Sequence, residues 1–167
     1  SVAKFEIMEK DESLRGIISE YQEPPLSSKG DLFATLIKSV VGQQISVIAA
    51  SAVWGRFCDC VGEVSPESIL EKSHSQLREV GLSNRKVEYI LGICDEWRKG
   101  LHEIEWDSLS DQEVIEELVK LRGVGRWTVE MLLIFALLRK DVFPIDDIGL
   151  IRGMEKLYNN GEPLEKS

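Results

Sequence analysis

Apolar residues recur at helical spacing along most of the chain, whereas no stretch of useful length alternates as a half-buried strand would. A short amphipathic helix is expected within residues 1–21, and Pro24 and Pro25 follow it. One core-forming series in a helical region from 31 to 57 consists of Leu32, Phe33, Leu36, Ile37, Val40 and Val41. Together these patterns predict an all-α fold.

Local start signals define the remaining expected helices. Ser65-Pro66 begins one with proline at its first helical position, and Ser110 with Glu113 forms a capping box for another. The helical region from 31 to 57 is expected to break near Gly42. The further expected helices span residues 66–72, 75–80, 85–97, 111–121, 127–138 and 148–157.

The acidic charge of the chain argues against a nucleic-acid partner, because affinity for DNA comes mainly from neutralising phosphates. The 167 residues carry a formal net charge of −9. The acids, however, cluster at residues 6–20, 103–107 and 111–117. The basic residues expected around one turn and the segment after it are Arg122, Arg126, Arg139, Lys140 and Arg152.

The three cysteines, Cys58, Cys60 and Cys94, are odd in number and show no paired C-x-x-C spacing. They predict neither a disulfide framework nor a zinc ribbon and favour a reducing, intracellular compartment, which would be a bacterial or archaeal cytoplasm or a eukaryotic nucleus. No apolar run is long enough to span a membrane, and no signal sequence opens the chain.

The stretch L-R-G-V-G-R-W-T-V-E-M, residues 121–131, is expected to form a tight turn between two helices. Gly123 and Gly125 bracket Val124, and the N–H groups at the start of the second helix would point out of the turn. Such a helix start binds anions, and a DNA phosphate would suit it, with Arg126 and Thr128 assisting. An ordinary helical hairpin, whose glycines serve only the turn, is the alternative.

An earlier segment repeats this unit in degenerate form. Without gaps, Gly81-Leu82 aligns with Gly123-Val124, but the earlier copy lacks the second glycine. The later copy also adds an arginine and a tryptophan. We therefore expect DNA contact at the later copy and a scaffolding role for the earlier one.

Two further polar clusters interrupt apolar surroundings. Gln43, Gln44 and Ser46 either line a polar cleft or form a solvated helix junction. Asp146 and Asp147 precede the last expected helix, and one of them is expected to cap it. A cap needs only one carboxylate, so the second could stabilise positive charge that develops on a sugar or orient an attacking water.

The chain resembles the helix-hairpin-helix (HhH-GPD) DNA glycosylase superfamily, and within it the 3-methyladenine DNA glycosylase II branch. Four blocks carry the resemblance in order over residues 32–154: S-V-V-G-Q-Q-I-S, G-L-S-N-R-K-V-E-Y-I, L-R-G-V-G-R-W-T-V-E-M and D-V-F-P-I-D-D-I-G-L-I-R-G. It implies one glycosylase unit over 1–167, made of two helical lobes with the active-site cleft between them. Family members continue through further helices, which leaves open whether C-terminal helices are missing here.

The resemblance also implies roles for individual residues. Asp147 is the expected catalytic residue, with Asp146 as cap or support. The expected DNA contacts are the N–H groups of Gly123, Gly125 and Arg126, the Thr128 hydroxyl, and Gln43 with Gln44, of which Gln44 is expected to fill the space of the flipped nucleotide.

The base pocket is expected to hold Trp127, which would stack on an electron-poor alkylated ring. Met131 and Phe33 are further candidate walls. For Trp127 and Met131, a plain core position is the alternative.

The implied activity is that of a monofunctional DNA-3-methyladenine glycosylase type II, an N-glycosyl hydrolase that flips and excises alkylated purines. Trp127 stands where related bifunctional enzymes carry a Schiff-base lysine, so we expect no AP-lyase step. The alternative is a non-catalytic helix-hairpin-helix DNA-binding module.

The resemblance implies no required cofactor and no iron-sulfur cluster. A structural Na⁺ or K⁺ is expected at the hairpin, held by the carbonyls of Val119, Leu121 and Val124. The expected partner is double-stranded DNA with a damaged base. The protein is expected to act as a monomer and not to bind a membrane.

Overall fold

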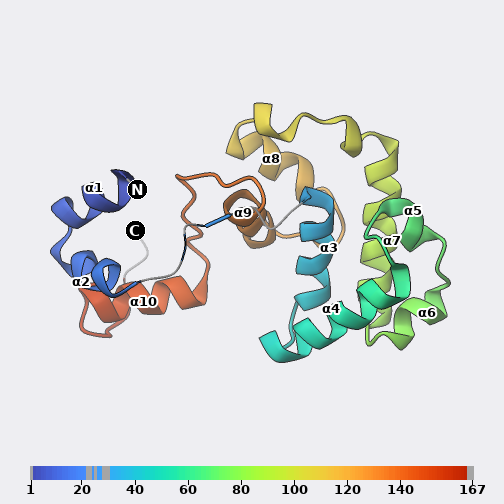
Figure 1. Ribbon diagram of the computed structural model, residues 1–167, viewed down its shortest axis with the longest axis horizontal. Helices are drawn as coiled ribbons and strands as arrows, with labels where there is room; N and C mark the ends of the chain where they lie inside the picture. The colour runs from blue at the N-terminus through green and yellow to red at the C-terminus, as the bar shows by residue number, and fades with distance from the viewer. Residues whose placement is uncertain (1, 22–23, 25, 28–30, 165–167) are drawn as a thin grey trace. The chain divides into compact units, whose positions relative to one another are not determined.

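The computed structural model describes residues 2–21, 24, 26, 27 and 31–164, with the side chains from residue 5 onward, and this part of the chain contains helices but no strand (Figure 1). The all-α prediction is confirmed. The α-helices are α1 (Val2–Lys10), α2 (Glu12–Glu20), α3 (Leu32–Gly42), α4 (Val47–Val61), α5 (Pro66–Leu70), α6 (His74–Glu79), α7 (Asn84–Lys99), α8 (Asp111–Leu118), α9 (Arg126–Phe135) and α10 (Ile148–Tyr158). Two 3₁₀ turns, η1 (Leu101–Glu103) and η2 (Trp106–Ser108), lie between α7 and α8.

The chain forms two compact units. One consists of Ser1–Leu26 with Pro144–Ser167, and the other of Ser27–Phe143. The expectation of a cleft between two lobes stays a prediction.

The core of the Ser27–Phe143 unit forms around α3, which packs against α4, α7 and α9. All six residues of the predicted core series on α3 are buried. They meet apolar side chains from the neighbouring helices, among them Phe57, Ile90, Leu118, Leu132 and Leu133. The helical periodicity of the sequence therefore predicted the inner face of α3 correctly.

The break after α3 falls where the two glutamines interrupt the pattern. Gln43 is extended, with φ −56° and ψ 136°, and Gln44 adopts a left-handed conformation with φ 59°. Ser46 then caps α4 by accepting a hydrogen bond from the Ala49 N–H. The expected break near Gly42 is confirmed as a four-residue junction, residues 43–46.

Two pairs of helices joined by a tight turn, α6–α7 and α8–α9, correspond to the repeat in the sequence. Gly81 and Gly123 take the same place in the two turns, with φ values of 106° and 91°. The Ser110–Glu113 capping box of α8 is present as predicted. Helix α8 ends three residues earlier than expected, at Leu118.

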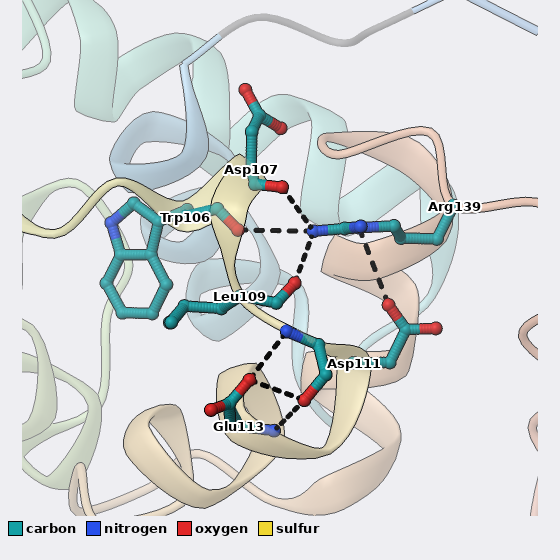
Figure 2. A network of polar contacts seen from close by, with 7 residues as sticks. Trp106, Asp107, Leu109, Asp111, Glu113 and Arg139 are labelled. Atoms are coloured by element: carbon teal, nitrogen blue, oxygen red, sulfur yellow. Dashed lines mark hydrogen bonds and ion pairs between the residues drawn. The ribbon is translucent and has the colours of Figure 1, made fainter.

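Arg139, one of the basic residues expected around the turn and the segment after it, is engaged within the protein. Its Nη2 donates to the carbonyls of Trp106, Asp107 and Leu109 at 3.2, 3.3 and 2.8 Å (Figure 2). Its Nε lies 3.4 Å from Asp111 Oδ1 as an ion pair, without a hydrogen bond. The guanidinium group therefore fastens the segment before α8 to the segment after α9.

The other unit contains α1, α2 and α10. The expected single N-terminal helix is in fact two, because the Asp11 carboxylate accepts from the Leu14 N–H and starts α2. Tyr158 on α10 donates from its hydroxyl to Asp11 Oδ2 at 2.6 Å. Pro25 lies outside the described residues. None of the described helices is long and apolar enough to cross a bilayer, and all three cysteines are free thiols.

Candidate nucleic-acid interface and active site

The turn between α8 and α9 ends in a helix start that no side chain caps. Gly125 is the N-cap of α9, with φ −98° and ψ 167°, and a Cβ placed on it would meet no atom within 4 Å. The first N–H groups of a helix have no partner within the helix, so this end of α9 can receive an anion. Of the two glycines expected to shape the turn, only Gly123 has a positive φ. At Gly125 the absent side chain leaves the start of α9 open.

The earlier copy closes the same position with its own side chain. Ser83, which aligns with Gly125, caps α7 by accepting from the Lys86 N–H at 3.3 Å. The Lys86 ammonium donates to the Val41 carbonyl at 2.7 Å, and burial lowers the pKa of Lys86. The start of α7 is thus closed by contacts within the protein, whereas the DNA contact expected at the later copy stays a prediction.

The polar side chains expected to assist at the α9 start are only partly available. Arg126 Nε lies 2.9 Å from Oε1 of Glu130, a carboxylate that is 5% exposed. Thr128 is only 4% exposed. Main-chain N–H groups are therefore the more accessible donors here, and the Arg126 guanidinium is shared with Glu130.

The α3–α4 junction presents a polar and an apolar surface. Gln43 Nε2 donates to the Gly123 carbonyl at 2.9 Å, whereas Gln44 is exposed. Val47 and Ile48, at the start of α4, are 86% and 84% exposed. The sequence reasoning missed these two residues, although their position directly after the Ser46 cap was a signal for a helix start.

A cavity of about 540 Å³ lies between the junction, α3 and the start of α9. Trp127 is 43% exposed and contributes to its wall, so Trp127 is not a plain core residue. The lining residues are Lys38, Ser39, Gly42, Gln43, Gln44, Ile45, Trp127 and Thr128. The structure thus brings both glutamines, Trp127 and Thr128 together, as a polar-cleft interpretation of the glutamines requires.

A smaller cavity of about 240 Å³ shares Lys38 and Ser39 with the first and includes Met131 in its wall. Lys38 was not a candidate in the sequence, yet Thr35, Lys38, Ser39 and Gly42 follow helical spacing on the polar side of α3. This polar stripe was the signal in the sequence that could have identified Lys38 as a lining residue.

Phe33 does not line either cavity, and its assignment as a pocket wall stays a prediction. It is 2% exposed and packs against Trp97, with ring centroids 5.1 Å apart. Phe33 belongs to the apolar face of α3, whereas the cavities open on its polar side.

Asp147 caps α10, which confirms that one of the two aspartates is the cap. Of the two roles expected for Asp146, cap or support, the cap was wrong and the support stays a prediction. The Asp147 Oδ1 accepts a hydrogen bond from the Leu150 N–H at 2.8 Å. The Asp147 N–H donates to the Pro144 carbonyl and so closes the preceding turn. Asp147 is half-buried and Asp146 is exposed. The cap bond orients the Asp147 carboxylate, but it does not test the catalytic role predicted for it.

The carbonyls expected to bind a monovalent cation lie on the α8–α9 turn. Leu121 O accepts from the Val124 N–H at 3.0 Å, which leaves one of its two lone pairs for another partner. Oxygen ligands of this kind suit Na⁺ or K⁺, so the turn is chemically compatible with the cation. The site at Val119, Leu121 and Val124 stays a prediction.

An uncapped helix start after a glycine turn, next to a cavity with a half-exposed tryptophan, is the arrangement expected of a helix-hairpin-helix protein. The family model for the HhH-GPD superfamily of base excision DNA repair proteins matches residues 37–167. The chain belongs to this superfamily, and its curated relatives place it in the 3-methyladenine DNA glycosylase branch.

The relatives agree in sequence and in structure. DNA-3-methyladenine glycosylase 1 of Schizosaccharomyces pombe is 35% identical over 85% of this chain and 64% of its own length. The crystal structure of a DNA-3-methyladenine glycosidase from Bacillus halodurans has a TM-score of 0.80 at 38% identity, covering 93% of this chain and 73% of that one.

A second solved structure, S. pombe 3-methyladenine DNA glycosylase in complex with abasic DNA, has a TM-score of 0.85 at 33% identity. It covers 97% of this chain and 82% of that one. By contrast, the chain spans less than two thirds of the length of the first three curated relatives.

Proposed function

We propose that this protein is a monofunctional DNA glycosylase that binds duplex DNA and hydrolyses the N-glycosidic bond of alkylated purines such as 3-methyladenine. The observation that carries the proposal is the half-exposed Trp127 in a cavity next to the uncapped start of α9. The names of the relatives support the same substrate class.

The uncapped α9 start would bind a backbone phosphate. The N–H groups of Gly123, Gly125 and Arg126 would donate to it, with Thr128 close by, and Gln44 with the exposed Val47 and Ile48 would contact the DNA where the base has left the stack. Apolar side chains can fill such a space and hold the duplex open.

The flipped base would lie against Trp127, with Met131 further along the same helix. An alkylated purine carries positive charge, and a tryptophan face attracts it by about 0.5–2 kcal/mol. Normal bases lack this charge, so the contact favours damaged ones.

In the chemical step the bond between C1′ and the base nitrogen breaks, and its electron pair leaves with the base, which becomes neutral. The Asp147 carboxylate would stabilise the positive charge that develops on the sugar. Water then adds to C1′ and releases a proton to solvent. Because Trp127 stands in place of a lysine, no covalent enzyme–sugar intermediate forms.

The experiment is release of methylated purines from DNA treated with a methylating agent. Asp147→Asn should lower the rate by at least about 100-fold, while Asn, also a good N-cap, keeps α10 capped. Asp146→Asn is the matched control and should keep the rate. Retention of the wild-type rate in Asp147→Asn contradicts the catalytic role.

Two further outcomes bear on the class of protein. DNA binding by the wild type without any base release supports the non-catalytic module instead. Intact abasic strands after base release, with no adduct trapped by borohydride, support hydrolysis; a trapped adduct contradicts the monofunctional mechanism.

A further inference from the structure

The side chain of Gln43 connects two segments that are 80 residues apart in the sequence. Its Nε2 donates to the Gly123 carbonyl at 2.9 Å, and the contact is partly buried. It joins the α3–α4 junction to the turn before α9.

The two adjacent glutamines differ in surroundings because the backbone changes conformation between them. Gln43 is extended and half-buried, whereas Gln44 has φ 59° and an exposed side chain. In the protein without DNA, the Gln43 amide donor is therefore already engaged by the main chain of the turn.

Gly123 is held from a second direction by α7. The ring of Tyr89 fills the space next to its Cα, so that a Cβ there would lie 2.2 Å from Tyr89 Cδ2. The Arg122 guanidinium lies over the same ring, 5.7 Å from its centroid. With φ at 91°, the Gly123 peptide has two neighbours that fix it, Tyr89 and Gln43.

We propose that Gln43 is a positioning residue, and not a DNA contact: its hydrogen bond to Gly123 holds the phosphate-binding turn in register with the α3–α4 junction. This inference rests on the proposed function. Gly125 and Arg126 follow Gly123 by two and three residues, so a shift of Gly123 moves the phosphate site relative to the cavity. Misplacement by about 1 Å can cost up to about 100-fold in rate.

The first test uses the protein without DNA, and so does not depend on activity. Gln43→Met removes the donor at similar size, and Gln112→Met, at an exposed glutamine on α8, is the matched control. Loss of one hydrogen bond of about 1 kcal/mol predicts roughly 3- to 10-fold faster amide hydrogen exchange in Gln43→Met alone at Val124, whose N–H donates to the Leu121 carbonyl within the turn. Unchanged exchange, or an equal rise throughout the protein, overturns the proposal.

The second test separates positioning from contact. The single-turnover rate of base release should fall about 10-fold in Gln43→Met, with less than about 3-fold loss of affinity for undamaged duplex. The reverse result, a loss of affinity at an unchanged rate, identifies a direct DNA contact and overturns the proposal. Gln43→Leu, which also lacks the donor and adds no charge, should repeat the result and serves if Gln43→Met fails to fold.

If the wild type releases no base, the proposed function fails while the exchange measurement still decides the role of Gln43.

Discussion

The ring of Tyr89 occupies the space that a side chain at Gly123 would need, since a Cβ at Gly123 would lie 2.2 Å from Tyr89 Cδ2. Gly123 also has φ 91°, which costs other residues about 1–2 kcal/mol. Together with overpacking, Gly123→Ala should destabilise the protein by about 2–4 kcal/mol. Denaturant unfolding measures this, and Tyr89→Ala in the same chain should recover the part that comes from overpacking.

Gly125 should tolerate a side chain in the fold but not in the complex with DNA. A Cβ there meets nothing within 4 Å, and φ is −98°. Gly125→Leu should therefore change stability by less than about 1 kcal/mol and weaken duplex binding by roughly 10-fold or more, because it blocks the helix start that receives the phosphate. Unchanged affinity in a binding titration would contradict the interface assignment.

Glu130 should weaken DNA binding in the wild type. Its buried carboxylate forms an ion pair with Arg126, with 2.9 Å between Glu130 Oε1 and Arg126 Nε. In Glu130→Gln the acceptor oxygen is kept and the negative charge is lost, so duplex affinity should rise a few-fold, with a steeper dependence on salt because Arg126 then neutralises a phosphate. A salt titration of binding measures both; Glu116→Gln on the exposed side of α8 is the control.

Arg139 should matter for stability and not for DNA. Its Nη2 donates to the carbonyls of Trp106 and Asp107 in η2 and of Leu109 directly after it (Figure 2). Arg139→Met leaves them without this donor, at a cost of about 2–3 kcal/mol. The salt dependence of DNA binding should stay the same, whereas a smaller slope would place Arg139 at a phosphate. Lys140→Met, at the exposed neighbour, controls for the loss of one positive charge.

The Tyr158–Asp11 hydrogen bond makes the stability of its unit depend on pH. The bond lowers the pKa of Asp11 and raises the pKa of Tyr158. Its stabilisation is therefore present between the two ordinary values, is lost on acidification through the lowered Asp11 pKa, and is lost on alkalinisation through the raised Tyr158 pKa. In Tyr158→Phe the Asp11 pKa should rise toward its ordinary value, as a carboxyl NMR titration would show; an unchanged Asp11 pKa would refute the coupling.

Helix periodicity and capping signals were sufficient for much of the fold. The apolar face of α3, the Ser110 capping box and the two glycine turns all depend on residues within a few positions of one another. Local interactions of this range are written directly into the order of residues. The blocks around Trp127 and Asp147 likewise sufficed to indicate the family.

Contacts between distant segments were decided only by the tertiary structure. Periodicity shows which residues share a helix face, but not which neighbour covers it, and so it could not place Phe33 against Trp97 or leave Ile48 exposed. The Arg139 clamp and the Gln43–Gly123 bond join segments about 30 and 80 residues apart. The sequence by itself determined the helices, the glycine turns and the candidate chemistry, whereas chain folding decided which polar groups are engaged within the protein and which stay accessible, because that depends on what is packed beside each of them.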